Sequence, residues 1–252
     1  MDSIIITGAS KGLGAAMVEQ LLPTGCRIFA VSRSTNQELI DRSKESPSLL
    51  SWIQADLSDP GQAPGLIEGI ARDIDTEGAR RLVLINNAGT VRPYGVMGAI
   101  DPEEARRGID LNVTAPVILT NSFVAAFRDA PGKKVVINIS SGASFRAMPG
   151  LGVYSATKAA LNLVTHAAAK ELSDSAAGSW WFFAVTPGKI DTPMQQSMRE
   201  EGSGVLPDHQ TYVEWKTTGE LVDPRESSAQ ILTLLDREDV ENGSFVKSQD
   251  LA

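Results

Sequence analysis

The chain has 252 residues, of which 42% are hydrophobic and 21% are charged, a composition ordinary for a soluble globular protein. Its formal net charge of −8 at pH 7 argues against nucleic acid or another polyanion as a partner. The length lies near the upper limit for one compact domain, so we expect a single domain over residues 1–252.

Neither a membrane-spanning segment nor a secretory leader is expected. No apolar run reaches membrane-spanning length, and the N-terminus enters the apolar stretch SIIIT without a basic region or cleavage site. The single cysteine, Cys26, cannot form an internal disulfide, which fits a reducing compartment. The two histidines, His166 and His209, form no cluster with it. We therefore predict a cytoplasmic protein without a metal site.

Short apolar runs alternate with amphipathic stretches along most of the chain. The expected strands are 3–7, 27–32, 51–56, 81–87, 134–141, 181–187 and 244–247. The expected helices are 12–22, 36–45, 62–77, 102–128, 153–173 and 225–237. Strands that are apolar on both faces and alternate with helices predict a parallel sheet covered on both sides. The expected fold class is therefore α/β, with a single doubly wound parallel sheet of the Rossmann type.

A glycine-rich loop, ITGASKGLG, follows the first expected strand and opens the first helix. At such a position, free backbone N–H groups and the helix dipole favour an anion. Gly8 permits a tight turn, Gly12 lets the backbone approach a pyrophosphate, and Gly14 lets helix and strand pack closely. The pattern indicates a dinucleotide site, although a glycine-rich turn without a ligand is the alternative.

The end of the second expected strand indicates which dinucleotide is bound. Sites for NAD usually place an acidic residue there, which binds the ribose 2′-hydroxyl. Here Ser32 takes that position and Arg33 follows it. Arg33 can bind a 2′-phosphate with its planar guanidinium, and Lys11 can approach from the glycine loop. A lone Arg33 could be a solvated surface residue, but two cations at one expected pocket favour NADP (NADPH).

A tyrosine and a lysine, Tyr154 and Lys158, lie four residues apart at the start of an expected helix, and hence on one face. A neighbouring ammonium is expected to lower the tyrosine pKa from its usual value near 10. Ser141, at the end of the preceding strand, can donate a hydrogen bond to a carbonyl oxygen. Each residue alone could be structural, but together they suit carbonyl reduction.

One segment, residues 193–219, interrupts the alternation because it is polar, dotted with glycine and weakly periodic. An insertion of this length in a compact domain is usually functional or disordered. It follows a strand end, where open α/β sheets bind their ligands. We interpret it as a substrate lid. Met194 and Met198 within it could line an apolar pocket or pack the lid onto the body.

From end to end, the chain resembles the short-chain dehydrogenase/reductase family. The motifs that carry the resemblance are TGASKGLG (7–14), NNAG (86–89), LNVTAP (111–116), INISS (137–141), YSATK (154–158) and TPGKIDT (186–192). The resemblance implies that Tyr154 is the proton donor and that Lys158 tunes it and binds the nicotinamide ribose. It also implies that Ser141 orients the substrate and that Asn112 supports a water-linked proton relay.

The same resemblance implies binding residues and an assembly. The implied cofactor-binding residues are Gly8, Ser10, Lys11, Gly12, Leu13, Gly14, Arg33, Asp56, Leu57, Asn87, Ala88, Gly89, Tyr154, Lys158, Pro187, Gly188, Ile190 and Thr192. The substrate residues are Ser141, Gly142, Tyr154, Gly188, Met194, Met198 and Lys247. Helices such as 102–128 and 153–173 form a dimer interface in this family, so a homodimer or a tetramer is expected. The same two helices could equally cover the sheet.

Within the family, the chain is most similar to sepiapterin reductases and bacterial benzil reductases. The segments that carry this similarity are INNAGTVRP (85–93), DTPMQQSMRE (191–200) and GELVDPRESSAQILTLLD (219–236). Sepiapterin reductases hold the pterin with an acidic residue on the last strand, where SFVKSQD places Lys247, with Asp250 close by. If Lys247 replaces the acid, the pterin loses its anchor and a diketone becomes the more natural substrate.

The sequence therefore predicts an NADPH-dependent carbonyl reductase that acts on a small dicarbonyl molecule, either a 1,2-diketone or a sepiapterin-like compound. One alternative is an NADP-dependent dehydrogenase of an alcohol, steroid or sugar. The other is a non-catalytic protein that senses NADP. The set of Ser141, Tyr154 and Lys158 weighs against the sensor, because a sensor needs no acid.

Overall fold

The computed structural model describes residues 1–173 and 179–251. Its strands form one parallel sheet in the order β3-β2-β1-β4-β5-β6-β7. The strands are β1 (Asp2–Thr7), β2 (Arg27–Ser32), β3 (Leu49–Gln54), β4 (Arg81–Asn86), β5 (Lys133–Ile139), β6 (Trp180–Thr186) and β7 (Phe245–Lys247). The α-helices are α1 (Gly12–Leu21), α2 (Gln37–Ser43), α3 (Ala63–Ala71), α4 (Pro102–Ile109), α5 (Ala115–Phe127), α6 (Gly152–Glu171), α7 (Pro193–Glu200), α8 (His209–Thr217) and α9 (Pro224–Leu232).

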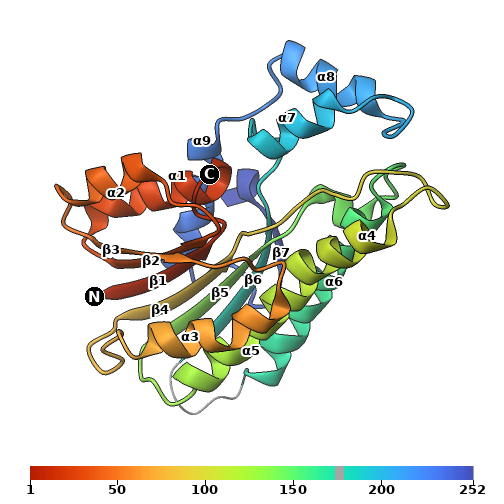
Figure 1. Ribbon diagram of the computed structural model, residues 1–252. Coiled ribbons are helices and arrows are strands. Elements are labelled where there is room, and N and C mark those ends of the chain that lie inside the picture. Colours follow the sequence, from red (N-terminus) through yellow and green to blue (C-terminus); the bar gives the residue numbers. More distant parts are fainter. Residues whose placement is uncertain (174–178, 252) are drawn as a thin grey trace.

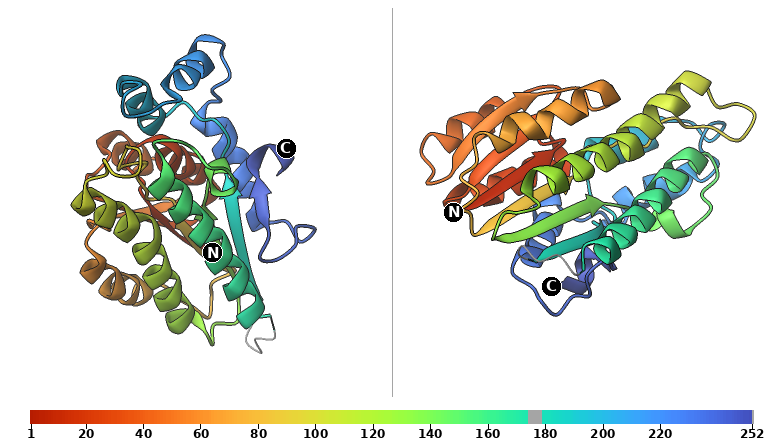
Figure 2. Two further views of the ribbon diagram at one scale, coloured as in Figure 1. Left: turned by 90° about the vertical axis from the view of Figure 1, so that its right-hand side faces the viewer. Right: turned by 90° about the horizontal axis from the view of Figure 1, so that it is seen from below.

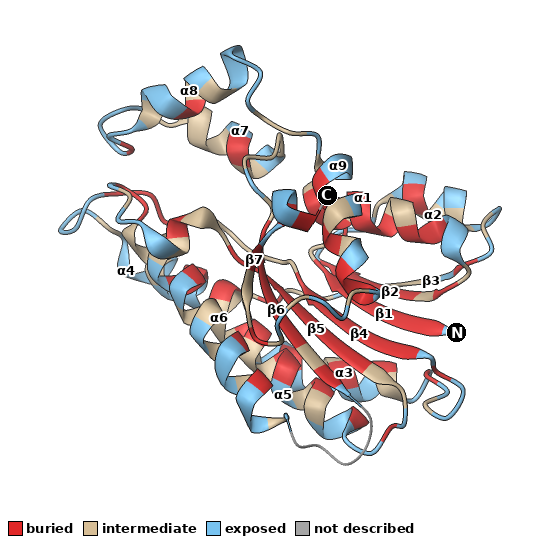
Figure 3. Cartoon of the chain, turned by 180° about the vertical axis from the view of Figure 1, so that it is seen from behind, coloured by how far each residue is buried: buried red, intermediate tan, exposed pale blue. Residues whose placement is uncertain are grey.

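Helices cover both faces of the sheet, as Figures 1 and 2 show. Because successive side chains of a strand point to opposite faces, Ile4 and Ile6 of β1 join the apolar core under α1, α2 and α9. Ile5 points the other way, into the core under α3, α5 and α6. Strands β1, β2, β4, β5 and β6 are buried almost throughout (Figure 3), whereas the edge strands β3 and β7 are only partly buried. The fold expected from the sequence, a doubly wound parallel sheet, is confirmed.

The strand order positions the candidate functional residues. Strand β1 pairs with β2 on one side and with β4 on the other. The chain therefore leaves β1 toward one half of the sheet and leaves β4 toward the other half, which opens a crevice at the carboxyl ends of these strands. Because all the strands are parallel, the loops that follow β1, β4, β5 and β6 lie at the same edge.

Several element boundaries differ from the expected ones. Strand β3 lies two residues earlier than predicted, in a register that pairs Leu49 with Arg27 and Gln54 with Ser32. Helix α3 ends at Ala71 instead of residue 77. Beyond its end, the Asp75 side chain accepts a hydrogen bond from the Gly78 N–H at 3.2 Å, a local turn that competes with the helix. Strand β5 ends at Ile139, so Ser141 lies just outside it.

The segment 193–219, predicted to be weakly periodic, contains the two helices α7 and α8. Helix α7 begins with a sequence signal that we did not use: Thr192 caps the helix by accepting from the Gln195 N–H, and Pro193 is its first residue. Both helices lie beyond the main body of the molecule in Figure 1. The sequence analysis assigned no helix to this segment and so missed both, and the role of the segment as a lid stays a prediction.

The expectation that no apolar run reaches membrane-spanning length has one exception. Residues Pro102–Phe127 form one helical stretch of 26 residues with a mean hydropathy of 1.3, enough to span a membrane by length and composition alone. A π-helical turn, Asp110–Thr114, joins α4 to α5 within it. In the fold, Leu119, Phe123 and Phe127 are each 1% exposed and pack against the sheet. One face of the stretch therefore packs against the sheet, and 33% of its most apolar 18-residue window is buried.

Candidate active site

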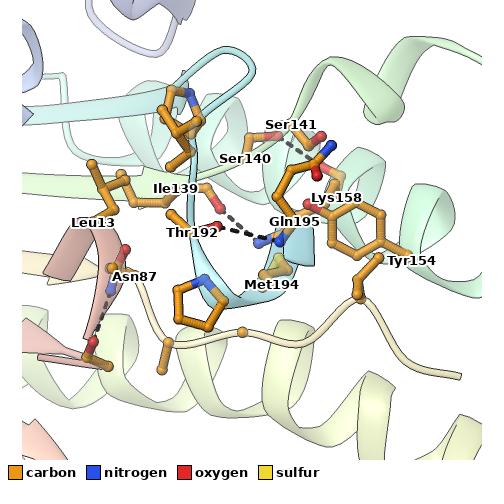
Figure 4. Close-up of a pocket in the computed structure, with 18 of the residues that line it drawn as sticks. Leu13, Asn87, Ile139, Ser140, Ser141, Tyr154, Lys158, Thr192, Met194 and Gln195 are labelled. Carbon is orange, nitrogen blue, oxygen red and sulfur yellow. Dashed lines mark hydrogen bonds between the residues drawn. The ribbon is translucent and has the colours of Figure 1, made fainter. Parts of the chain in front are cut away.

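A pocket of about 840 Å³ opens at the carboxyl edge of the sheet and contains most of the residues that the sequence singled out (Figure 4). Those that line it are Gly8, Ser10, Lys11, Gly12, Leu13, Arg33, Asp56, Leu57, Asn87, Ala88, Gly89, Ser141, Gly142, Tyr154, Lys158, Pro187, Gly188, Ile190, Thr192, Met194, Met198 and Lys247. Gly14 and Asn112 are the two of our candidates that do not line it. Residues from distant parts of the chain thus share one cavity.

The glycine loop packs tightly against the loop that follows β4. Gly8 and Gly12 have positive φ angles of 67° and 57°. A Cβ at Gly8 would lie 2.8 Å from the Ala88 Cα, and a Cβ at Gly14 would lie 2.4 Å from the Gly8 carbonyl oxygen. Asn87 ties the two loops together, because its Nδ2 donates to the Thr7 carbonyl oxygen at 2.8 Å. Gly8 and Gly12 thus leave bare backbone at the pocket, as close approach of a pyrophosphate requires.

Two basic residues, Lys11 and Arg33, are exposed at this end of the pocket. Neither forms a salt bridge with any residue that the structure describes. Ser32 is fixed in the turn before Arg33, since its Oγ donates to the Ser34 carbonyl oxygen at 2.8 Å. The two cations are therefore available to a phosphate, and they suit the 2′-phosphate of NADP.

The carboxylate of Asp56 lines the same end of the pocket but is already hydrogen-bonded. Its Oδ1 accepts from the N–H and the hydroxyl of Ser58, at 3.0 and 2.7 Å. Burial acts to raise the pKa of Asp56, but these hydrogen bonds and the charge of Arg33 outweigh it, so the pKa is lowered. Asp56 is therefore an ionised neighbour of Arg33 within the predicted adenine end of the site.

Ser141 and Tyr154, two of the predicted catalytic residues, both line the pocket. Ser141 lies where the chain leaves β5, and its Oγ accepts from the Ala143 N–H at 3.2 Å. Burial raises the pKa of the Tyr154 phenol, and a hydrogen bond with Ser141 only partly opposes this. The predicted lowering of this pKa by a neighbouring ammonium was wrong. Lys158 Nζ lies 5.9 Å from the centre of the Tyr154 ring, and burial dominates the tyrosine.

Lys158 is buried below Tyr154 on α6, with 5% of its surface exposed. Its Nζ donates to the Ile139 carbonyl oxygen at 2.7 Å, at the end of β5 (Figure 4). Burial disfavours the charged form and lowers the lysine pKa to about 8. The ammonium is thus anchored to the sheet, on the same helix face as the phenol.

Asn112 lies within the π-helical turn and is 1% exposed. Its Oδ1 accepts from the Thr90 N–H at 2.8 Å, and its Nδ2 donates to the Thr90 carbonyl oxygen at 2.7 Å and to Thr157 Oγ1 at 3.1 Å. It therefore holds the loop after β4 against α6. Its implied role in a proton relay stays a prediction.

The remaining part of the pocket is apolar and lies under α7 and α8. Met194 and Met198 pack there against a small cluster separate from the main core, whose other members are Val91, Tyr94, Met148, Leu151, Tyr154, Leu206, Tyr212 and Trp215. Two contacts hold α7 to the loop after β4: the Tyr94 and Ser197 hydroxyls lie 2.8 Å apart, and Arg92 pairs with Glu201 at 2.9 Å. Lys247 lines the pocket from the end of β7, and it is exposed.

Several pocket residues were missed by the sequence reasoning, among them Arg146, Gln195, Tyr212 and Trp215. Tyr212 and Trp215 lie three apart on α8, and this helical spacing of aromatic residues was an available signal. Gln195 had no signal, because only the fold shows that it is 5% exposed. Over residues 1–173 and 179–251, no group of His, Cys, Asp or Glu could hold a metal ion, and the predicted lack of a metal site stays a prediction.

A dinucleotide-type glycine loop shares one cavity with a half-buried tyrosine and a buried lysine. These features define the class of protein, an oxidoreductase that acts on CH–OH and C=O groups. The model of the short chain dehydrogenase family matches residues 2–203. The chain is 32% identical over 247 residues to benzil reductase ((S)-benzoin forming) of Bacillus cereus, covering 98% of this chain and 99% of the relative. It is 33% identical over 258 residues to sepiapterin reductase of Bos taurus, covering 98% and 94% of the two chains.

Two solved structures share the fold of this chain. The KRED1-Pglu enzyme superposes with a TM-score of 0.81 at 27% identity, covering 98% of this chain and 100% of the other. A short-chain dehydrogenase from Sphingobium yanoikuyae, solved in complex with NADPH, has a TM-score of 0.75 at 26% identity, covering 98% and 86%. This chain belongs to the short-chain dehydrogenase/reductase family.

Proposed function

We propose that this protein is an NADPH-dependent carbonyl reductase that converts a small dicarbonyl compound, a 1,2-diketone or a sepiapterin-like molecule, to a hydroxyketone. The observation that carries the proposal is the single pocket in which Ser141 and Tyr154 lie together with the glycine loop and Arg33. The benzil reductase and sepiapterin reductase relatives support a dicarbonyl as the substrate class.

The residues of this chain fit a dinucleotide phosphate. The glycine loop would hold the pyrophosphate on backbone N–H groups, because no side chain at Gly8 or Gly12 stands in its way. Lys11 and Arg33, which have no partner carboxylate within salt-bridge distance in the described chain, would bind the 2′-phosphate. When bound, the cofactor supplies the hydride that reduces the carbonyl carbon.

The protein side of the reaction is the delivery of one proton. Burial keeps the Tyr154 phenol protonated at neutral pH, which suits an acid in the reductive direction. Tyr154 would give this proton to the carbonyl oxygen as the hydride reaches the carbon, which turns C=O into CH–OH. The Lys158 ammonium would stabilise the phenolate that remains. Ser141 would donate a hydrogen bond to the same oxygen and orient it.

The substrate end of the pocket supports a small, uncharged molecule. Met194 and Met198 would cover its apolar part, with α7 and α8 acting as the lid. Lys247 forms no salt bridge with a described residue and has only donors to offer. A pterin, which carries donors of its own, would find no acceptor there, whereas a second carbonyl oxygen would find a donor.

The proposal is tested by the loss of NADPH absorbance with a panel of 1,2-diketones, sepiapterin, sugars and steroids. We expect NADPH to be consumed with the diketones, and chromatography to recover one hydroxyketone per NADPH. Tyr154→Phe serves as the control for reduction that the protein does not catalyse. A protein that binds NADPH but consumes none with any carbonyl compound would be a sensor instead of a reductase.

We further propose a cytoplasmic homodimer, with a tetramer as the larger alternative. Helices α5 and α6 cover the sheet. This is one of the two roles that the sequence analysis considered for them, the other being a dimer interface. Leu163 on α6 is 70% exposed, and a partner subunit on that face would cover it. Light scattering of the wild type and of Leu163→Glu measures the assembly, and a monomeric wild type would contradict the dimer.

A further inference from the structure

Gln195, in the first turn of α7, combines burial with an unused hydrogen-bond donor. It is 5% exposed, yet its Nε2 has no partner among the residues that the structure describes. The residue lines the pocket, and Figure 4 shows its side chain directed into the cavity that Ser141 and Tyr154 share. A buried donor without a partner is unfavourable. The position of this donor therefore points to an acceptor that a ligand supplies.

The orientation of the Gln195 amide is set by its neighbours. Its Oε1 accepts a hydrogen bond from Arg199 Nη1, one turn further along α7. Arg199 is held in turn by Asp191, with 3.8 Å between Nη2 and Oδ1. The Gln195 backbone N–H is fixed as well, since it donates to Thr192 Oγ1 at 3.4 Å. Because the amide oxygen is occupied, the group that remains for a ligand is the NH₂, which only donates.

We propose that Gln195 is a specificity-determining residue that selects dicarbonyl substrates. Its Nε2 donates to the second oxygen of the substrate, while Ser141 and Tyr154 hold the oxygen of the carbonyl being reduced. The inference rests on the proposed function. Lys247 is exposed and can keep its ammonium in water, whereas the buried Gln195 donor has no other partner in the described chain. A monoketone leaves this donor unpaired, so Gln195 favours the diketone more strongly than an exposed group can.

Two substitutions separate the donor from the rest of the side chain. Gln195→Glu keeps the shape and an acceptor for Arg199 but removes the NH₂, and Gln195→Leu removes both polar groups. The matched control is Gln196→Leu, because Gln196 is the next residue on α7, is exposed, and its side chain bonds only to Glu200 in the described chain. Each protein is assayed with 1-phenyl-1,2-propanedione and with propiophenone, which has the same carbon skeleton without the second oxygen.

The readout is the ratio of kcat/KM for the dione to kcat/KM for propiophenone, the monoketone. If propiophenone is turned over too slowly, its inhibition constant is measured instead. We expect both Gln195 variants to lower this ratio about tenfold or more, the scale of one lost buried hydrogen bond. The KM for NADPH is expected to stay unchanged, and Gln196→Leu is expected to behave as the wild type. Gln195→Glu retains the Arg199 contact and provides the test if Gln195→Leu fails to fold.

Three results would overturn the inference. If the wild type reduces the dione and the Gln195 variants keep its ratio, Gln195 does not select the substrate and the proposed function stands. If both ketones decline equally while the KM for NADPH rises, the donor serves the cofactor. If the wild type reduces no diketone at all, this inference fails, and the proposed function fails with it only if sepiapterin is not reduced either.

Discussion

The Lys158 Nζ lies 2.7 Å from the carbonyl oxygen of Ile139. This hydrogen bond joins the first turns of α6 to the carboxyl end of β5, and it is made by an ammonium that is 5% exposed. A buried ammonium is stabilised by such a contact but loses its hydration, and the net result is a pKa lowered to about 8. The lysine thus titrates close to physiological pH.

This titration predicts a pH dependence of the reduction. The lowered pKa means that Lys158 is charged below pH about 8 and loses its proton as the pH rises through that value. The raised pKa of Tyr154 keeps the phenol protonated over the same range. We therefore expect kcat/KM for carbonyl reduction to fall above pH about 8, measured at saturating NADPH. A profile that stays level well into the alkaline range would exclude Lys158 as the titrating group.

The cofactor prediction concerns Arg33. Because Ser32 and Arg33 stand where an NAD site has its acid, we expect kcat/KM with NADPH to exceed that with NADH at least tenfold, roughly 1.4 kcal/mol. Arg33→Asp should erase or reverse this preference, since it replaces a phosphate-binding guanidinium by a carboxylate. The matched control is Arg72→Asp, which makes the same charge change at an exposed position outside the pocket. Equal use of both cofactors by the wild type would contradict the assignment.

The chemical prediction concerns Tyr154. Tyr154→Phe removes the proposed acid and should lower kcat by about 10²-fold or more, with NADPH binding largely retained. Lys158→Ala should weaken both the rate and cofactor binding, because the lysine is implied to contact the nicotinamide ribose. Stopped-flow turnover and fluorescence titration with NADPH measure the two effects separately. Near-normal turnover by Tyr154→Phe would refute the mechanism.

A second tyrosine of the pocket provides the control. Tyr212 is 1% exposed, its hydroxyl has no hydrogen-bond partner in the described chain, and burial raises its pKa to about 12. Tyr212→Phe removes an unpaired buried polar atom, so the free energy of unfolding should rise by about 1 kcal/mol, measured by urea denaturation. Its turnover should fall far less than that of Tyr154→Phe, because the Tyr212 hydroxyl is not proposed to transfer a proton. If Tyr212→Phe lost activity as severely as Tyr154→Phe, the phenol at 154 would have no special role.

The substrate prediction concerns Lys247. We expect the wild type to reduce 1,2-diketones with a higher kcat/KM than sepiapterin. The Lys247 ammonium and the pterin would both present hydrogen-bond donors, so pterin groups would stay unpaired, at a cost of about 1–3 kcal/mol per buried group. Lys247→Asp should shift the ratio toward sepiapterin by restoring an acceptor at the end of β7. The comparison requires kcat/KM for both substrates in both proteins. A ratio that Lys247→Asp leaves unmoved would show that residue 247 does not contact the substrate.

The sequence by itself determined the fold class and most of the residues gathered in the pocket. Because the strands are apolar on both faces, a parallel sheet between two layers of helices is the favourable way to bury them. A glycine loop of this pattern is typical of the turn between a strand and a helix. The position of Arg33 after β2 and the four-residue spacing of Tyr154 and Lys158 are local features, so they could be predicted without the rest of the structure.

Only the tertiary structure decided what depends on burial. The Tyr154 pKa is raised instead of lowered, because the fold encloses the phenol and keeps the Lys158 nitrogen 5.9 Å from its ring centre. The unpaired Gln195 donor exists because Arg199 occupies the amide oxygen while α7 covers the pocket. The adjacent Gln195 and Gln196 are the same amino acid, yet Gln195 is buried and Gln196 is exposed. Successive residues of a helix face different directions, and only the packing of α7 decides which of the two faces the pocket.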